Sequence, residues 1–276
     1  MEATHGVPAT GHVPPPAYTS IPLPNGMVMH HGEGKYQLAH PNQTCFSQYG
    51  QESVIADLVR GRTPLQGRFF VEVGGFDGET FSNSLYFERE LGWNGLLVEA
   101  NPLAYRTLLT KGRRAYSVHA CLGSDVELSF QLAGDMTVAT KHGSAAHAKK
   151  VRRVYGQPAL RTRGGHGGGL REGQGGGGRE RGEDTRVACA ALTDLLSAVP
   201  GMVRPARVDL MILDVEGAEL DVLQSLRWDL LDIRILMVEV VEHREHISAL
   251  LRSKGYVLAH SGHIDDFYVK KSKFGR

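Results

Sequence analysis

The chain has 276 residues, a hydrophobic content of 41%, a charged content of 22% and a formal net charge of +1. This length and composition predict one sizeable folded domain with tails, and they exclude a wholly disordered chain. The near-neutral charge gives no reason to expect a nucleic acid or an anionic membrane as partner. No stretch approaches the roughly 18 apolar residues of a membrane-spanning helix, so we expect no transmembrane segment.

The three cysteines, Cys45, Cys121 and Cys189, are widely spaced and odd in number. This pattern argues against a disulfide framework and against a structural zinc site, and it favours a reducing compartment. Residues 1–24 hold no apolar stretch, so we expect no secretory signal and a cytoplasmic location. The tripeptide Asn42-Gln43-Thr44 matches a glycosylation acceptor, but that matters only in a secreted chain, and we expect a chance match.

Residues 1–40 contain several prolines, and we expect them to form a flexible tail. Beyond the tail, apolar residues recur with helical or strand periodicity. The expected helices cover 48–60, 81–91, 102–111, 192–199, 216–226 and 243–254, and the expected strands cover 68–73, 96–99, 115–120, 126–132, 208–213, 233–240, 256–260 and 267–269. Their alternation predicts an α/β fold, with a doubly wound, Rossmann-like, mostly parallel sheet of seven strands in a domain over 41–271.

An insert interrupts this pattern between residues 141 and 186. Its glycine runs at 167–169 and 175–178 cannot bury a core or hold a helix, so we expect a flexible segment. The insert is locally basic, and RGG-like sequence can bind RNA, but acidic residues dilute the charge. We therefore expect a solvated loop or a lid over the substrate side, and no nucleic-acid partner.

The first candidate site is a glycine-rich turn, Glu72-x-Gly74-x-x-x-Gly78, between a strand and a helix. Glycine suits this position because the backbone must bend sharply and let a ligand approach. The carboxylates of Glu72 and Asp77 are expected to face the crevice beyond the strand, where a cationic ligand suits them. S-adenosylmethionine (SAM) carries an ammonium and a sulfonium, whereas a pyrophosphate cofactor favours a less acidic turn.

Acidic residues also end two other predicted strands. Glu99 closes the strand that follows the turn, where an acid in a Rossmann unit reaches the two ribose hydroxyls of a nucleotide. Asp214 ends a later apolar strand, and Glu216 starts the next helix. This pair could accept a proton from a hydroxyl, hold a substrate or bind a hard metal ion, and the spacing does not separate these options. His243, after another strand, is a candidate general base.

Several segments together resemble the FkbM-type methyltransferases. The matching segments are 47–52 (SQYGQE), 70–78 (FVEVGGFDG), 82–84 (SNS), 91–102 (LGWNGLLVEANP) and 213–220 (LDVEGAEL). The likeness runs from about Cys45 to Lys271, with the glycine-rich insert as an interruption. It implies a class I methyltransferase fold and SAM-dependent, mainly O-directed methyl transfer to a small-molecule, glycan or lipid acceptor.

The resemblance also implies roles for single residues. It places Glu72, Gly74 and Gly78 at the methionine portion of SAM and Glu99 at its ribose. The complete expected cofactor set is Glu72, Gly74, Asp77, Gly78, Glu99, Asn101 and Cys121. The expected catalytic or substrate-side set is Asp214, Glu216 and His243, with no metal.

Other segments are similar to the animal, Star-like branch of that family. They are 187–189 (VAC), 226–228 (LRW) and 265–269 (DDFYV). Star-type proteins are associated with traffic of growth-factor precursors from the endoplasmic reticulum to the Golgi apparatus and carry a membrane anchor, whereas we expect no spanning segment in this sequence. The resemblance leaves a second hypothesis open, a non-catalytic protein of vesicle-mediated transport with peripheral association to those membranes.

Overall fold

The computed structural model describes residues 15–60, 66–133, 136–139 and 184–271. Its centre is a nine-stranded sheet in the order β1-β2-β5-β4-β3-β10-β11-β13-β12. The strands are β1 (Tyr18–Pro22), β2 (Val28–Gly32), β5 (Tyr116–His119), β4 (Asn94–Glu99), β3 (Phe69–Val73), β10 (Ala206–Leu213), β11 (Leu231–Glu239), β13 (Asp265–Lys270) and β12 (Tyr256–Ser261). The five inner strands from β5 to β11 run parallel, and the two strands at each edge are antiparallel to their neighbours.

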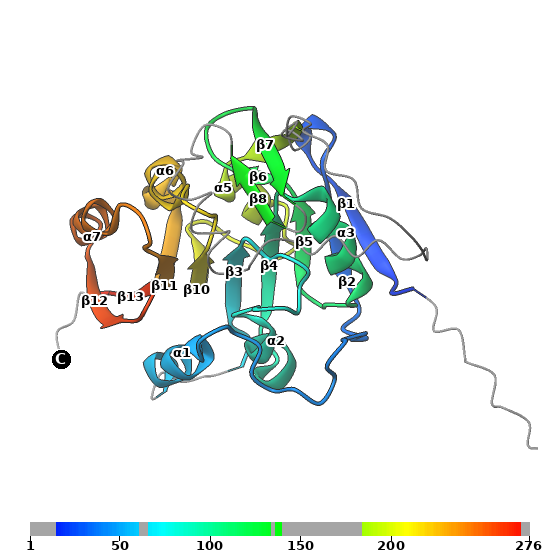
Figure 1. Ribbon diagram of the computed structural model, residues 1–276, viewed down its shortest axis with the longest axis horizontal. Coiled ribbons are helices and arrows are strands. Elements are labelled where there is room, and N and C mark those ends of the chain that lie inside the picture. The colour runs from blue at the N-terminus through cyan, green and yellow to red at the C-terminus, as the bar shows by residue number, and fades with distance from the viewer. Residues whose placement is uncertain (1–14, 61–65, 134–135, 140–183, 272–276) are drawn as a thin grey trace, which may run out of the picture.

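Helices cover both faces of this sheet, which makes the fold a doubly wound α/β structure. In Figure 1, α5 (Leu192–Ser197), α6 (Glu219–Ser225) and α7 (Arg244–Ser253) lie above the sheet, and α1 (Gln51–Val59) and α2 (Leu85–Leu91) lie below it. The helix α3 (Pro102–Thr110) packs on β4 and β5, and its Tyr105 and Leu108 belong to the same buried cluster as residues of α1 and α2. Two short 3₁₀ helices are η1 (Pro24–Gly26), between β1 and β2, and η2 (Trp228–Leu230), between α6 and β11.

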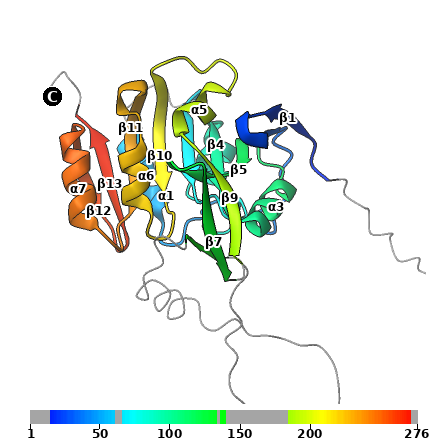
Figure 2. The ribbon, with the colours of Figure 1, turned by 90° about the horizontal axis from the view of Figure 1, so that it is seen from above.

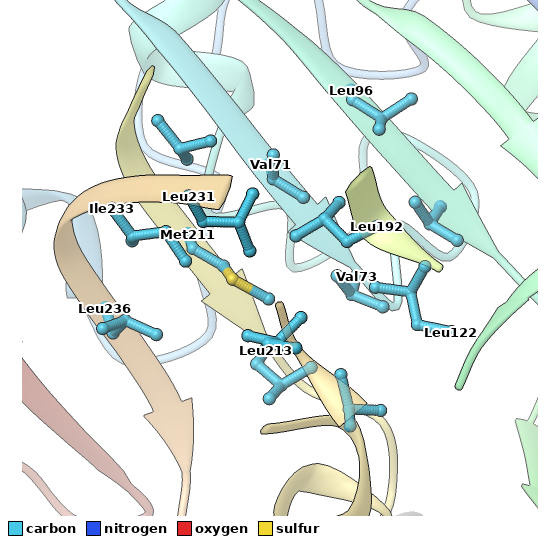
Figure 3. Close-up of a cluster of buried hydrophobic side chains, with 14 of the residues drawn as sticks. Val71, Val73, Leu96, Leu122, Leu192, Met211, Leu213, Leu231, Ile233 and Leu236 are labelled. Carbon is cyan, nitrogen blue, oxygen red and sulfur yellow. The ribbon is translucent and has the colours of Figure 1, made fainter. Parts of the chain in front are cut away.

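Alternation along the strands divides the core into two clusters. Val71 and Val73 of β3 point to the cluster under α5, α6 and α7, where Met211 and Leu213 of β10 join them (Figure 3). Phe70, which precedes Val71 in β3, points to the opposite cluster. Because the inner strands are buried on both faces, they read in the sequence as nearly continuous apolar runs.

A second, smaller sheet has the strand order β6-β9-β7-β8. Its strands are β6 (Cys121–Leu122), β7 (Glu127–Ala133), β8 (Met136–Ala139) and β9 (Asp184–Ala190), and β7 and β9 run side by side in Figure 2. Cys121 pairs with Cys189 in the register of β6 and β9, and the two form a disulfide. The expectation that no cysteine forms a disulfide is therefore wrong. The bond spans 68 residues of sequence, and only the pairing of these strands brings the two thiols together.

Two expectations about the chain's organisation also need correction. The tail expected over 1–40 is wrong for its second half, because β1 and β2 form a hairpin that extends the sheet beside β5. Proline is compatible with an edge strand, so Pro22 ends β1 without interrupting the sheet. The sheet accordingly has nine strands instead of seven. Residues 184–186, assigned to the insert, belong to β9, while 140–183 lie outside the described residues.

The helix and strand positions otherwise follow the sequence pattern within a few residues. The largest shift is at α2, which begins at Leu85, because residues 82–84 bind Glu72 and do not continue the helix. Among the helices of the described residues, none has the length and apolar character needed to cross a membrane.

Candidate functional site

The candidate site lies where the parallel strands end. Gly74 follows β3, Glu99 ends β4 and Asp214 follows β10, and these three strands are neighbours in the sheet. Glu239 ends β11, where it pairs with Asp265 at the start of the antiparallel β13. The carboxyl edge of an open parallel sheet is the usual ligand-binding edge of such folds. We name this row of chain ends the carboxyl edge.

The glycine-rich turn is tied to both neighbouring strands. Gly74 has a φ of +88°, and its N–H donates to the carbonyl of Val98 at 2.9 Å. A Cβ on Gly74 would lie 1.8 Å from the carbonyl oxygen of Asp214, so no other residue fits there. At Gly78, which has a φ of +79°, a Cβ would lie 3.0 Å from Cγ of the Leu108 side chain, a less severe contact. Glycine at position 74 therefore lets the turn approach the backbone of Asp214. The sequence analysis explained the glycine by the close approach of a ligand.

Glu72 is engaged by the protein itself. One carboxylate oxygen accepts the N–H of Asn83 at 2.8 Å, and the other accepts the hydroxyls of Ser82 and Ser84. Burial raises the pKa of Glu72, and the charge of Arg113 together with these donors opposes the rise. The side chain lies on the face of β3 that packs with α2, so Glu72 organises the 82–84 turn.

Arg113 continues this arrangement beneath the glycine-rich turn. Its guanidinium donates to the carbonyl of Gly78 at 2.6 Å, to Ser84 Oγ at 2.9 Å and to Glu88 at 2.9 Å. The side chains of Arg113 and Glu88 are only 1% and 0% exposed, so this is a fully buried ion pair. We call Glu72, Ser82, Ser84, Glu88 and Arg113 the arginine network, and it fixes the end of the glycine-rich turn.

Asp77 caps its own turn. One oxygen accepts the N–H groups of Glu79 and Thr80, at 2.9 and 2.6 Å, and the other accepts the Thr80 hydroxyl. Lys111 lies 3.8 Å from the carboxylate and makes a closer bond, at 2.7 Å, with Glu79. Asp77 therefore shapes the turn that carries Gly78, because its oxygens are turned to backbone donors.

Glu99 lies at one end of the carboxyl edge, where β4 ends beside β3. Its two oxygens accept the N–H of Phe76, at 2.7 Å, and the N–H of Asn101, at 2.6 Å. Burial raises the pKa of Glu99 to about 7, against the lowering effect of these backbone bonds, and the charge of Glu216 raises it further. Each carboxylate oxygen can accept a second bond, so Glu99 retains acceptor capacity. Asn101 caps α3 by accepting the N–H groups of Leu103 and Ala104.

Asp214 faces other acids. Burial raises its pKa well above the usual value, and the charges of Glu239, Glu216, Glu219 and Asp265 raise it further. Glu219 accepts the N–H groups of Val215 and Gly217, and Asp265 accepts the side-chain amide of Gln51. Glu216 adopts a φ of +56°, a costly conformation for a residue with a side chain. We call Asp214, Glu216, Glu219, Glu239 and Asp265 the acidic cluster.

Three members of this cluster have the arrangement of a metal site. Ligand oxygens of Asp214, Glu219 and Glu239 lie within 4.8 Å of one another. Carboxylate oxygens suit a hard cation such as Mg²⁺ or Ca²⁺. The sequence left this option open beside proton transfer and substrate binding, and the geometry is compatible with all three.

Three further candidates occupy different surroundings. His243 is exposed at the start of α7, where its ring lies edge-on to His246. His119 donates its Nε2–H to the carbonyl of Ala100 at 3.0 Å, and its ring stacks on Tyr105. Burial lowers the pKa of His119. Cys121 is buried in its bond to Cys189, immediately after β5, so its sulfur is not a free ligand.

Sequence reasoning missed several residues of the site. Arg113, Glu88 and Gln51 were not singled out, although Gln51 and the 82–84 turn fall in segments that carry the family likeness. No local pattern marks Arg113, because its partners lie 25 to 35 residues earlier in the chain.

Comparisons with known proteins identify the family of the chain. A protein called Methyltransferase 1 from Beauveria bassiana (strain ARSEF 2860) is 38% identical over 82 residues, 28% of this chain, and the match spans only 31% of that relative's length. Two solved structures align at low similarity. Magnesium protoporphyrin IX methyltransferase from Synechocystis PCC 6803 with bound SAM is 11% identical, with 80% of this chain and 78% of that chain covered and a TM-score of 0.34.

The second is precorrin-6y C5,15-methyltransferase from Geobacter metallireducens GS-15, which is 7% identical, with 86% and 93% covered and a TM-score of 0.36. The match that decides the family is to the methyltransferase FkbM domain, over residues 72–258, which is more than half of the chain. That range begins at Glu72 and contains Glu99, Asp214 and Glu239. The chain belongs to the FkbM methyltransferase family, whose methyltransferases use SAM as cofactor.

Proposed function

We propose that this protein binds SAM across the ends of β3 and β4 and transfers its methyl group to a hydroxyl oxygen of a small-molecule, glycan or lipid acceptor. The observation that carries the proposal is the position of Glu99. Its buried carboxylate ends β4 beside the glycine-rich turn, and two backbone N–H groups orient it. An acid with spare acceptor capacity at this place suits the two hydroxyls of a ribose.

Other residues prepare the pocket for SAM. The backbone of Gly74 and Gly78 lines the turn, and Asn101 fixes the start of α3 beside Glu99. We assign Glu72, Asp77 and Cys121 to shaping this wall, because their polar atoms are engaged by protein partners. The bound cofactor supplies an electrophilic methyl group on a positively charged sulfur. The negative charge of the acidic cluster favours a ligand of that sign.

Asp214 is the residue we propose as proton acceptor. A carboxylate accepts a proton from a hydroxyl more readily as its own pKa approaches the working pH, and burial and neighbouring acids raise the pKa of Asp214. Glu216 has a positive φ, and its charge raises the pKa values of both Glu99 and Asp214. We therefore assign Glu216 to contact with the acceptor. Alignment of the hydroxyl supplies most of the rate gain, because methyl transfer needs an in-line approach.

His243 is a weaker candidate than Asp214. Its exposure and its contact with His246 leave it outside the cluster of raised pKa values. The argument for a reducing compartment from the cysteine spacing loses its basis, because Cys121 and Cys189 are bonded.

Calorimetric titration with SAM tests the proposal. We expect binding by the unchanged protein and a loss of about 10- to 100-fold in affinity for Glu99→Ala, because hydrogen bonds to a charged group contribute about 1.5–3 kcal/mol. Glu245→Ala, an exposed acid at the start of α7, is the matched control and should bind normally. A non-catalytic protein that does not bind SAM would give no heat in any of the three titrations.

Isotope-labelled SAM then tests transfer. Purified protein is incubated with SAM labelled in the methyl group and with pools of hydroxylated metabolites, glycans and lipids, and labelled products are identified by mass spectrometry. We expect label on oxygen, and we expect Asp214→Asn to abolish its appearance while SAM still binds. Label on nitrogen or carbon would contradict the acceptor chemistry and leave SAM binding intact.

A further inference from the structure

A surface turn carries the tripeptide Asn42-Gln43-Thr44. All three residues are exposed. The turn is closed by a bond from the N–H of Gln43 to the carbonyl of His40, at 3.0 Å. Arg89 of α2 holds it from below, with bonds to the carbonyls of Pro41, at 3.1 Å, and Gln43, at 2.7 Å. The backbone of the turn is thus fixed to α2, and its side chains are available at the surface.

This turn presents the chemical groups that N-linked glycosylation requires. The acceptor is the side-chain amide nitrogen of an asparagine, and a hydroxyl two residues later, here that of Thr44, completes the signal. The middle residue is Gln43, not proline, so the signal is intact. The exposed side chain of Asn42 leaves room for a bulky group that a buried asparagine would exclude.

The disulfide supplies the context that the sequence lacked. Cys121 and Cys189 are both buried, and their bond lies at the centre of a small apolar cluster with Phe130 and Val187. Disulfides form and persist in secretory and extracellular compartments and are rare in the cytosol of most organisms. N-linked glycans are added in the same oxidising route. Two independent features, far apart in the sequence, therefore indicate one environment.

We propose that Asn42 is an N-linked glycosylation site and that the chain matures in an oxidising, secretory compartment. In the transfer, the Asn42 amide nitrogen forms a bond to C1 of the first sugar of a lipid-pyrophosphate-linked oligosaccharide. The bond from C1 to the pyrophosphate breaks, the lipid pyrophosphate leaves and the amide loses one proton. In the oxidation, the Cys121 and Cys189 thiols give two electrons and two protons to a disulfide-bearing oxidant. Neither step depends on methyl transfer.

Peptide mapping of the full-length protein, immunopurified from its native tissue, tests this proposal. Free thiols are first alkylated in denaturant without reduction. The protein is then treated with peptide-N-glycosidase in heavy-oxygen water, which converts a glycosylated asparagine to a labelled aspartate. We expect labelled aspartate at position 42 in most molecules, alkylation of Cys45, and no alkylation of Cys121 or Cys189 before reduction. Asn25, which is exposed but has no hydroxyl residue two positions later, is the internal control and stays unlabelled.

Expression of the full chain behind a cleavable secretory leader in animal cells gives the variant series. Asn42→Gln and Thr44→Ala should each abolish the mobility shift on deglycosylation, whereas Thr44→Ser should retain it. Unmodified Asn42 in the native protein overturns the glycosylation site, whatever the state of the disulfide. Alkylation of Cys121 and Cys189 before reduction overturns the oxidising compartment.

Discussion

The arginine network and the acidic cluster both hold several carboxylates, but their electrostatic surroundings are opposite. The network is fully buried, whereas Asp214 and Glu216 of the cluster are half-buried. In the network, Glu88 pairs with Arg113, and Glu72 accepts three protein donors. In the cluster, the charges acting on Asp214 are those of four other acids. The folded chain therefore pairs opposite charges in the network and gathers like charges in the cluster.

The difference separates structure from site. A matched network stabilises the turn that carries Gly78 and needs nothing from outside. Accumulated acids store repulsion that a ligand of opposite charge relieves, which is typical of functional sites. By this criterion we propose that Glu72, which the sequence placed at the cofactor, acts in the structure of the turn, and that Asp214 acts in the chemistry.

The largest expected effect comes from removing the cation of the network. Arg113→Met leaves Glu88 buried and unpaired, and breaking a buried pair in this way costs about 3–5 kcal/mol. Arg113→Lys keeps the charge but loses the fork that reaches Gly78, Ser84 and Glu88 together, so it should lie between Arg113→Met and the unchanged protein. Denaturant unfolding followed by circular dichroism measures both.

The matched control for that series is Arg234→Met on β11. Arg234 contacts Asp232 at 3.7 Å, and the two side chains are 44% and 35% exposed. We therefore expect this variant to lose less than about 1 kcal/mol of the free energy of unfolding. Equal losses for Arg113→Met and Arg234→Met would show that the network is dispensable. The comparison of the two acidic regions would then have no basis.

The second prediction concerns the acidic cluster and has the opposite sign for stability. Asp214→Asn removes one charge from a group of like charges, so the variant should be more stable at pH 8 by about 1 kcal/mol or more, while methyl transfer falls by about 10²- to 10⁴-fold. A carboxyl whose pKa is raised by folding stabilises the fold at low pH and loses that contribution as the pH rises through its folded pKa. The gain should therefore shrink toward pH 4.

Thermal unfolding across pH 4–8 checks this sign. Glu245→Gln, an exposed acid of α7, is the control and should change stability by no more than about 0.5 kcal/mol at any pH. Destabilisation by Asp214→Asn at pH 8 would contradict stored repulsion and would show that Asp214 has a favourable partner in the apo protein.

The third prediction uses the pKa of about 7 at Glu99. If the carboxylate accepts the ribose hydroxyls, SAM binding favours its charged form, and affinity should rise as pH passes from 6 to 8, by at most about tenfold per unit below the pKa. Glu99→Gln should flatten this profile. A SAM analogue without the ribose 2′-hydroxyl should show a weaker dependence in calorimetry. An unchanged profile in Glu99→Gln would mean that another group titrates.

Much of the carboxyl edge could be predicted from the sequence because it depends on topology alone. Apolar runs that alternate with helices predict a parallel sheet, and the residue after each run must then emerge at one edge. This logic predicts the positions of Glu99 and Asp214. In the structure they lie at the ends of β4 and β10, which are separated by β3 alone. The partners of a buried side chain do not follow from such logic. Arg113 contacts Gly78, which lies 35 residues earlier, and the residues next to Arg113 in the sequence do not predict this contact.

The same distinction explains the disulfide and the hairpin. Cys121 and Cys189 meet because β6 and β9 pair across a long connection, and spacing in the sequence carries no information on that pairing. The hairpin was hidden because extended chain with prolines has the same pattern in a tail and in an edge strand. Local patterns therefore predicted elements, while contacts between distant elements required the structure.

The smallest predicted effect tests whether the network acts on the cofactor turn. Ser82 Oγ donates to Glu72 at 3.1 Å, accepts the N–H of Leu85 at 3.2 Å and lies 3.3 Å from Arg113. Ser82→Ala removes these bonds with little change in volume, and a typical net hydrogen bond contributes about 1 kcal/mol. We expect a loss of about that size in denaturant unfolding and a severalfold weaker affinity for SAM, with kcat unchanged. Ser82 touches neither reacting group, so a fall in kcat at saturating SAM would move the network from positioning the turn to catalysis itself.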